Sequence, residues 1–340
     1  MKKMELYFLS VGYGEAIVLL DGTHCLVIDG GPGSADEAYH VPGTIRLETF
    51  LAQKKVSAID YMICTHLHND HISGLLETAR TIQVREFWVN CWPECPVDRA
   101  IEAAEPECPN DLSLRLFTEG LKHFRALRAV LRQQNTVIRE RTETRDYEPL
   151  WDGCSIRLFG MNQEHMMERR MQFEQFCREE NAEAAREAMR EFDRAENTCS
   201  LACSLKIGGW RAFLTGDLCA GWEERCADER FESAEVLKLT HHGQRDGMPQ
   251  CLVEACDPEI FVMCSDHLRT FNSACDEVAA RAETYLKERG RTAQIYTTGL
   301  LTQSFGTENG NPPCALCCSG ETKPVCTPYY VEEGNWNETS

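Results

Sequence analysis

The strongest constraint on the fold is a histidine-rich run that directly follows an apolar segment. Residues 59–64 are almost continuously apolar and predict a buried strand, and the next residues read THLHNDH (65–71), ahead of a helix predicted over 73–80. The possible ligands in this run are His66, His68, Asp70 and His71. Imidazole and carboxylate groups suit zinc and other divalent transition metals, and at this spacing they can converge on two neighbouring ions. The run therefore predicts a metal site at a strand end.

Two other predicted strands end in residues of the same types. The strand over 210–215 leads into Gly216 and Asp217, and the strand over 236–240 leads into His241 and His242. Each feature alone is weak, because an aspartate after glycine is usually a turn residue and a histidine pair is more often on the surface. However, six residues of one loop cannot enclose two ions, and all three loops can leave one edge of the sheets. We therefore expect these strand ends to supply further ligands.

The order of predicted elements favours two facing sheets with helices outside them. Further strands are predicted at 5–9, 16–20, 25–29, 84–89, 136–139, 155–159, 200–207, 260–264 and 293–297. Helices are predicted at 44–53, 111–134, 163–196 and 273–289. The charged segment 163–196 keeps its apolar residues on one face, which predicts a solvated helix packed along one side, with a lid or dimer helix as the sharper alternative. Beyond about Gly306 we expect a poorly ordered tail without periodicity.

Composition restricts the compartment and the partners. No run approaches the roughly 18 to 20 apolar residues that span a bilayer, and residues 1–9 are too short for a signal-peptide core, so we expect a cytoplasmic protein without membrane insertion. The 19 cysteines are an odd number, which favours thiols in a reducing cell. A structural zinc in the cysteine clusters at 91–108 or 314–326 is a weaker idea than ordinary thiols. With 54 acidic residues against 35 Lys and Arg, the formal charge of -19 disfavours tight nonspecific binding of duplex DNA.

Six short motifs occur in a characteristic order along the chain. They are VGYGEA (11–16), VIDGG (27–31), the histidine run with Gly74, NTCSL (197–201), LTGD (214–217) and LKLTHHG (237–243). In this order they resemble the metallo-β-lactamase fold superfamily, and specifically the hydrolase domain of ComEC-type competence proteins, over about residues 4–302. The resemblance implies a four-layer αββα sandwich over residues 1–305, with helical insertions at about 98–134 and 163–196. A Cys/Gly/Pro-rich tail at 306–340 would follow.

The resemblance also implies how two divalent ions, Zn²⁺ or Mn²⁺, share the ligands. It assigns His66 and His68 to the first ion, Asp70 and His71 to the second, and Asp217 to a bridge between them. The second ion would be completed by His241 or His242, and the position at the strand end favours His241. Asp29 resembles the family's structural aspartate, which orients the histidine run without binding an ion.

Three positions depart from the family pattern. Asn197 stands where the broader superfamily has a third histidine for the first ion, as in ComEC-type domains, so we expect that ion to be bound weakly. Gln244 follows His-His-Gly, where the family usually has serine. The family's downstream His-Pro feature is missing, with residues 270–272 near its place and His267 slightly before it, which affects substrate recognition.

The favoured function is hydrolysis of a phosphodiester by a metal-bound hydroxide, as a phosphodiesterase or nuclease. Asp70, Asp217 and the ions would position the hydroxide, and His242 or Gln244 would contact the substrate or the leaving group. An alternative is a small-molecule hydrolase acting on an ester, thioester, lactone or amide, which the acidic charge and the absence of a Lys/Arg run favour. A second alternative is a binding or regulatory module of the same fold without turnover. The natural substrate, the metal, the oligomeric state and any link to DNA uptake stay open.

Overall fold

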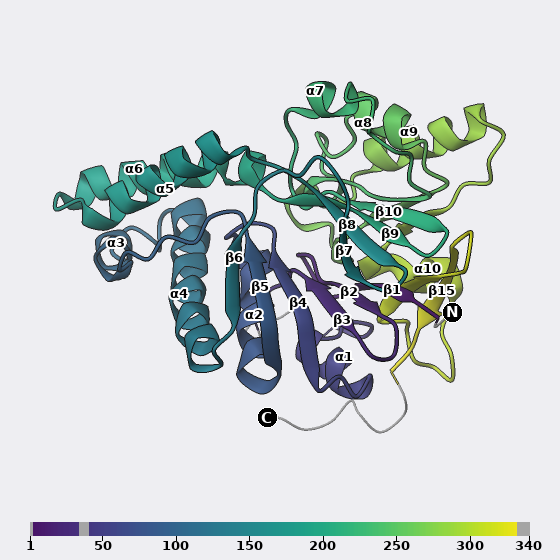
Figure 1. The fold of residues 1–340 in the computed structure, drawn as a ribbon, viewed down its shortest axis with the longest axis horizontal. Coiled ribbons are helices and arrows are strands. Elements are labelled where there is room, and N and C mark those ends of the chain that lie inside the picture. Colours follow the sequence, from purple (N-terminus) through teal and green to yellow (C-terminus); the bar gives the residue numbers. More distant parts are fainter. Residues whose placement is uncertain (1–2, 34–40, 332–340) are drawn as a thin grey trace.

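Short apolar runs between glycine-containing turns form the strands of two sheets. The computed structural model describes residues 3–33 and 41–331. Within that part of the chain, the first sheet has eight strands in the order β15-β14-β1-β2-β3-β4-β5-β6, and the second has seven in the order β13-β12-β11-β10-β9-β8-β7. The two sheets face each other, and helices cover their outer faces (Figure 1). The predicted sandwich of two sheets between helices is confirmed.

The strands that pair in each sheet come from distant parts of the chain. The first sheet contains β1 (Glu5–Leu9), β2 (Ile17–Leu20), β3 (Cys25–Ile28), β4 (Ala58–Cys64), β5 (Gln83–Val89), β6 (Val137–Glu140), β14 (Ala315–Ser319) and β15 (Val325–Tyr329). The second contains β7 (Glu148–Trp151), β8 (Cys154–Phe159), β9 (Ala202–Ile207), β10 (Trp210–Leu214), β11 (Val236–Lys238), β12 (Ile260–Met263) and β13 (Ile295–Thr297). Strands β3 to β6 are parallel, as are β10 to β13. The C-terminal end of β4 therefore lies at one end of the first sheet, and the C-terminal ends of β10 and β11 lie side by side at one end of the second.

Successive side chains along a strand point to opposite faces of its sheet, and the buried side chains form three layers. In β1, Leu6 and Phe8 face the second sheet, whereas Tyr7 and Leu9 pack beneath the helices outside the first sheet. In the second sheet, Phe213 belongs to the outer layer beneath the helices on that side. Because helices cover the outer faces, most strands are buried on both sides and are continuous apolar runs rather than alternating ones.

Ten helices surround the sheets within the described residues. They are α1 (Leu47–Gln53), α2 (Asn69–Thr81), α3 (Asp98–Ala104), α4 (Leu112–Gln133), α5 (Gln163–Arg178), α6 (Ala182–Glu196), α7 (Trp222–Cys226), α8 (Gln250–Cys256), α9 (Asp276–Glu288) and α10 (Leu301–Phe305). Short 3₁₀ turns occur at Asn197–Cys199, His241–Gly243, Thr270–Asn272 and Thr298–Leu300. Among the described helices, none combines the length and the apolar character that crossing a bilayer requires.

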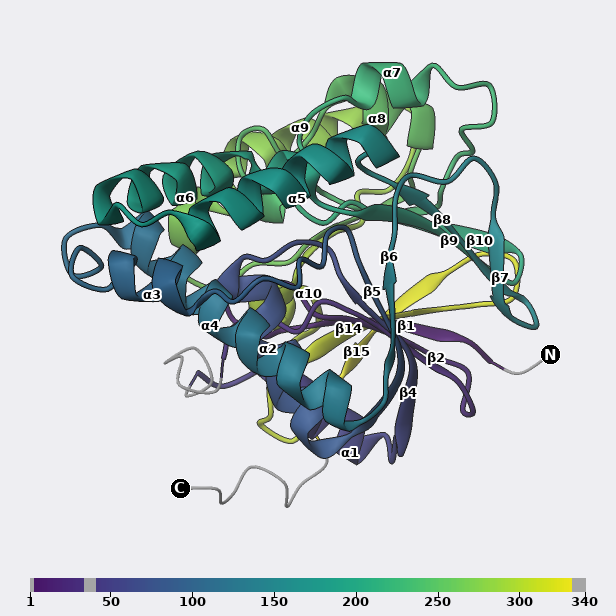
Figure 2. The same ribbon diagram turned by 60° about the vertical axis from the view of Figure 1, so that its left-hand side comes forward.

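The segment 163–196 forms a hairpin of two helices rather than one solvated helix. Helices α5 and α6 lie side by side and extend away from the sheets together with α3 (Figure 2). The chain turns at 179–181, where the Asn181 side chain accepts a hydrogen bond from Ala184 N and caps α6. Phe173 and Phe192 pack together and join the core that covers the first sheet. The aromatic side chains of the hairpin therefore extend the core that lies outside the first sheet.

The expected tail after Gly306 is wrong for its described part. Strand β14 pairs antiparallel with β1, and β15 pairs with β14, so both extend the first sheet. Leu316 and Cys318 face the second sheet, while Cys317 faces the opposite side. Cysteine behaves here as a small apolar residue, so the run ALCCS (315–319) is a good strand despite its unusual composition. Residues 332–340 of the proposed tail lie outside the described residues.

Replacement of Leu316 by alanine tests whether β14 belongs to the core. Its side chain is fully buried between the sheets, so we expect the free energy of unfolding to fall by about 2–5 kcal/mol. Val325→Ala on β15 is the matched control, since its side chain is 61% exposed and the change should stay within about 0.5 kcal/mol. Urea denaturation of both variants provides the measurement, and equal stabilities would contradict the placement of β14.

Candidate metal centre

The histidine run starts at the end of β4 and continues into the first turn of α2. His68 is the N-cap of α2, so Asp70 and His71 are helical residues while His66 lies in the preceding loop. Helix α2 packs directly on the chain after β3: Gly30 N donates to His71 O at 2.8 Å, and a Cβ on Gly74 would lie 1.9 Å from Gly30 O. Only glycine fits at this contact, which brings the first turn of α2 against Asp29.

Each histidine of the centre uses one ring nitrogen for a hydrogen bond that fixes its orientation. His71 Nδ1 donates to Asp29 Oδ2 at 2.7 Å, and His242 Nδ1 donates to Cys264 O at 2.9 Å. His66 Nδ1 lies 3.0 Å from the hydroxyl of Thr65, which itself donates to Asp29 Oδ2 at 2.6 Å. A proton is therefore held on Nδ1 of each of these three rings, and Nε2 is the nitrogen that faces the centre.

His68 is oriented through its other ring nitrogen, Nε2, by a residue of the helical insertion. Its Nε2 lies 3.1 Å from Oδ1 of Asp193 on α6, and its Nδ1 lies 2.9 Å from His66 Nε2. The Asp193 carboxylate also accepts a hydrogen bond from the Ser113 hydroxyl at the start of α4. A carboxylate that accepts from the outer nitrogen of a histidine leaves the inner nitrogen free as a ligand. The inner nitrogens of His66 and His68 thus lie close together, although no compact group of possible ligands among the described residues includes His68.

Two carboxylates complete this group of lone pairs. Asp217 Oδ2 lies 3.3 Å from His242 Nε2, 3.5 Å from His71 Nε2 and 3.9 Å from His66 Nε2. Asp70 Oδ2 lies 3.1 Å from His242 Nε2 and 3.5 Å from His71 Nε2. Three possible ligand sets result within the described residues, His66/His71/Asp217, Asp70/His71/His242 and Glu15/Asp217/His242, and the atoms within each set lie within 4.8 Å of one another.

The centre gathers carboxylates and imidazoles that attract positive charge, which protons or a bound cation would supply. His71 Nε2 and His242 Nε2 are 3.2 Å apart although the other nitrogen of each ring holds the proton. Burial lowers the pKa of His242, but the Asp217 and Asp70 carboxylates outweigh burial and raise it to about 9. Burial raises the pKa of Asp70, but the neighbouring imidazoles lower it to about 2. Asp217 Oδ1 is buried with no hydrogen-bond partner among the described residues. This donor set fits divalent transition metals.

The structure places His242, not His241, among these ligands. Both residues have left-handed backbone angles, with φ 48° at His241 and 54° at His242, and this turn sends the second ring into the interior. The His241 ring instead lies near the surface of the cavity, with Nε2 3.1 Å from Nδ2 of Asn197 and 3.1 Å from Nε2 of Gln244. The position at the strand end favoured His241 as the ligand. The left-handed turn after β11 instead directs the His242 ring toward Asp70 and Asp217.

Asn197 lies at the side of the centre where the first ion is expected. Its Nδ2 contacts His241, and its Oδ1 is buried without a hydrogen-bond partner among the described residues. An amide oxygen is a weaker ligand for zinc than an imidazole, so the position is consistent with a loosely held first ion.

Sequence reasoning missed three residues that contact the centre. Asp193 lies on the insertion, and its contact with His68 had no local signal. Glu15 and Lys238 form a fully buried ion pair beneath the ligands, and Lys238 Nζ also donates to Gly216 O at 2.8 Å and lies 3.8 Å from Asp217 Oδ1. A lysine inside the apolar strand β11 is a sequence signal that could have identified this pair, because lysine is almost never fully buried unless paired.

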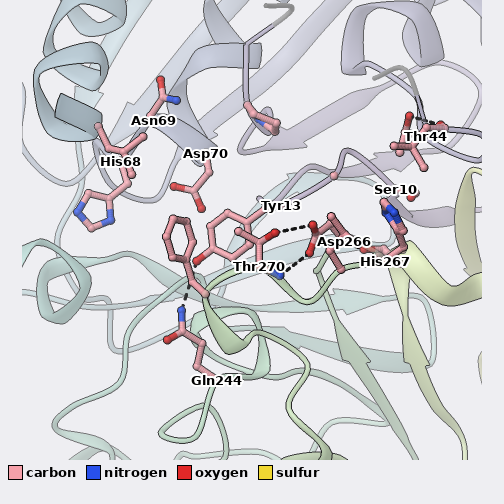
Figure 3. Close-up of a pocket in the computed structure, with 18 of the residues that line it drawn as sticks. Ser10, Tyr13, Thr44, His68, Asn69, Asp70, Gln244, Asp266, His267 and Thr270 are labelled. Atoms are coloured by element: carbon pink, nitrogen blue, oxygen red, sulfur yellow. Dashed lines mark hydrogen bonds between the residues drawn. The ribbon is translucent and has the colours of Figure 1, made fainter. Parts of the chain in front are cut away.

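The centre forms part of the surface of a cavity of about 1030 Å³ between the two sheets' edges and the start of α4. Asp70, Gln244 and Tyr13 face one another there, and Gln244 Nε2 donates to the Tyr13 hydroxyl at 3.3 Å (Figure 3). His267 also lines the cavity, away from the ligand sets. Asp29 does not line the cavity, and its carboxylate contacts the centre through the hydrogen bond from His71 Nδ1.

Removal of the Asp193 charge is expected to lower the affinity of the protein for the first ion selectively. Asp193→Asn removes the carboxylate that orients His68, so we expect the affinity for one of two ions to fall about 10- to 100-fold, with the other unchanged. Calorimetric titration of the metal-free protein with Zn²⁺ provides the measurement. Glu187→Gln, at an exposed position of the same helix, is the matched control. Two unaltered binding steps in Asp193→Asn would contradict this role.

The two adjacent histidines provide a second comparison. His242→Ala removes a lone pair directed at Asp70 and Asp217, so we expect the metal content of the purified protein to fall by one ion. His241→Ala leaves all three possible ligand sets intact, and its metal content should equal that of the wild type. Elemental analysis by mass spectrometry distinguishes them, with circular dichroism to verify folding. Loss of an ion in His241→Ala alone would reverse the assignment.

The chain was compared with known proteins in three ways. A family model described as the metallo-beta-lactamase superfamily matches residues 9–90, and no curated protein matches the chain. In structure, the chain is similar to Igni18, a metallo hydrolase from the archaeon Ignicoccus hospitalis, with 16% identity, a TM-score of 0.45, and coverage of 86% of this chain and 94% of that chain. It is also similar to YhfI, a metallo-β-lactamase fold protein from Bacillus subtilis, with 11% identity, a TM-score of 0.41, and coverage of 86% of this chain and 96% of that chain. An isothiocyanate hydrolase from Delia radicum gut bacteria gives 15% identity, a TM-score of 0.41, and coverage of 86% and 95%.

These comparisons do not confirm the resemblance to ComEC-type domains. The matched region, residues 9–90, contains Asp29 and the whole histidine run, which carry most of the first ligand set. The family model matches residues 9–90 only, and the two-sheet architecture is consistent with the metallo-β-lactamase fold.

Proposed function

We propose that the protein is a metal-dependent hydrolase of small organic substrates. The observation that carries the proposal is the cluster of imidazole nitrogens and carboxylate oxygens at the surface of a cavity. His66, His68 and Asp217 would hold one ion, and Asp70, His71, His242 and Asp217 the other. Divalent ions, when bound in such a site, lower the pKa of water to about 7 and stabilise negative charge on a substrate oxygen.

The residues around the ions have separate roles in this proposal. Asp217 lies between the two ligand sets and would fix their separation, while Asp70 faces the cavity and would orient the attacking water. Tyr13 is the proposed hydrogen-bond donor to the substrate. Burial raises the pKa of its phenol, so the group stays protonated, and its oxygen accepts from Gln244, which directs the proton elsewhere. A donor of this kind stabilises an oxyanion that develops during hydrolysis.

The cavity favours a small substrate over a polynucleotide. Its volume of about 1030 Å³ is at the upper end of the roughly 300–1,000 Å³ typical of small-molecule sites. Among the described residues that line it, Arg115 is the only lysine or arginine, whereas four aspartates are present. A single-stranded nucleic acid is usually bound in a groove of positive charge with aromatic platforms, and this cavity lacks the charge in its described lining. An ester, thioester, lactone or amide is therefore preferred.

Phosphodiester hydrolysis is the second candidate, and one feature favours it. Asp217 belongs to both the His66/His71 set and the Glu15/His242 set, so it is placed to bridge two close ions. Two metal ions held close together stabilise the attacking and leaving oxygens in phosphoryl transfer. A small phosphodiester would fit the cavity as well as an ester does.

A substrate panel tests the proposed function. We expect protein loaded with Zn²⁺ or Mn²⁺ to hydrolyse members of a set of aryl esters, thioesters, lactones and amides, and chelator-treated protein to be inactive until the ion is restored. Asp217→Asn removes the central carboxylate and should lower the rate about 100-fold or more. Asp146→Asn, at an exposed position outside the cavity, is the control.

The same panel includes bis(p-nitrophenyl) phosphate, nucleotides and single-stranded DNA. Turnover of these phosphodiesters alone would establish the second candidate and reject the first. Protein that binds metal yet hydrolyses no member of either set would reject both and favour the binding or regulatory module.

A further inference from the structure

Exposed apolar side chains gather at the opening of the cavity. Within the described residues, seven large hydrophobic side chains are clearly exposed, and three of them line this one cavity. These three are Leu112 (48% exposed), Leu268 (73%) and Phe271 (50%). Exposed apolar surface concentrated around a cavity marks a binding site more often than scattered apolar residues do.

We propose that these residues form an apolar subsite for the acyl or aryl group of the substrate. The inference deepens the proposed hydrolase function and rests on it, because the ligand is taken to be the molecule that reacts at the metal centre. The occupant is then an amphipathic small molecule, with its reactive group at the ions and its apolar group between α4 and the loop at 266–272.

The apolar surface is continuous with the metal ligands. The ring of Tyr13 lies 4.8 Å from the ring of His242 on one side and 5.0 Å from the ring of Phe271 on the other. On the facing wall, Leu112 and Leu116 come from the first turns of α4. A ligand whose reactive group is at the ions therefore meets apolar side chains as it extends outward.

The loop that carries Leu268 and Phe271 is held in a strained conformation. Arg269, Phe271 and Asn272 have φ values of 57°, 54° and 61°, in the left-handed region that non-glycine residues rarely adopt. Such conformations cost about 1–3 kcal/mol each and persist only where surrounding contacts impose them, typically at ligand-binding sites. The strain here directs two apolar side chains toward the cavity instead of into the core.

Hydrogen bonds supply the contacts that impose this conformation. Asp266 accepts from Thr270 N at 2.7 Å and from the Thr270 hydroxyl at 2.6 Å (Figure 3). At the other end of the loop, Ala274 N donates to His242 O at 2.8 Å. The loop is thus anchored to the same turn that places His242 at the centre, so the subsite and the ligands keep a fixed spacing.

The charges that line the cavity restrict the rest of the ligand. Two of the four aspartates, Asp70 and Asp217, belong to the ligand sets, Asp193 is taken up by His68, and Asp266 by Thr270. Arg115 lines the cavity at an exposed position, so its charge is available to a ligand. The subsite therefore suits an apolar group with at most one negative charge near α4.

A series of n-alkylphosphonates with two, four, six and eight carbons tests the subsite. The phosphonate binds divalent ions, and the chain reports the apolar contact. With Zn²⁺-loaded protein, we expect calorimetric Kd values to fall about threefold to fourfold for each methylene that enters the subsite. Leu268→Ser and Phe271→Asn should flatten this dependence while the two-carbon ligand binds as before. Asparagine is chosen because it tolerates the left-handed backbone at this position.

Met171→Ser is the matched control, since Met171 is 64% exposed on α5 and does not line the cavity. It should keep the full dependence on chain length. Equal affinities for the two- and eight-carbon ligands would overturn the subsite, even if the protein hydrolyses esters. A chain-length dependence that is lost in Leu268→Ser would support the subsite, even if no ester is hydrolysed and the proposed function fails.

Discussion

The candidate centre depends on one buried carboxylate, that of Asp29. Its oxygens accept hydrogen bonds from Thr65 N at 2.8 Å, from the Thr65 hydroxyl at 2.6 Å and from His71 Nδ1 at 2.7 Å. These bonds tie the end of β3 to the end of β4 and to the first turn of α2. Because every partner is a donor, the buried charge is fully solvated by the protein, and the Nδ1 protons of His71 and His66 are held on the side away from Asp217. The remaining lone pairs must then face one another, which is the condition that favours a cation.

The sequence predicted those parts of the site where the local pattern decides the structure. The apolar run 59–64 became β4 and ends at the histidine run, and Asp217 follows β10 at the edge of the second sheet. His242 could not be chosen over His241, because the choice depends on two consecutive left-handed residues, and histidine carries no signal for that conformation as glycine does. Asp193 could not be found either, since it reaches His68 across 125 positions of the chain through the packing of α6. Strand β14 was missed because the segment after Gly306 has no periodicity, and its cysteines were interpreted as ordinary thiols rather than as apolar strand residues.

The ion pair of Glu15 and Lys238 explains how so many acids coexist beneath the centre. Asp29, Asp217 and Glu15 are all buried within the same region, and Lys238 is the cation among them. Burial lowers the pKa of Lys238, but Glu15 and Asp217 outweigh this and raise it, so the ammonium keeps its charge. Removing one partner of a buried pair leaves an uncompensated charge and costs about 3–5 kcal/mol. The pair is therefore better understood as a fixed counter-charge that holds the Gly216 turn, and with it Asp217, than as a source of net stability.

The helical insertion connects the ligands of the first ion to the shape of the cavity. Asp193 and Glu196 are three residues apart and lie on one face of α6. Asp193 holds His68, and Glu196 accepts a hydrogen bond from Leu67 N at 3.0 Å while pairing with the buried Arg169. Asp193 also accepts from Ser113 in the first turn of α4, and the neighbouring side chains of that turn form a wall of the cavity. Since one packed unit contributes both the contact with His68 and that wall, a change in how α4 and α6 pack would alter ion binding and substrate selection together. The insertion thus contacts the site, whereas its sequence favoured a solvated helix, with a lid or dimer helix as the alternative.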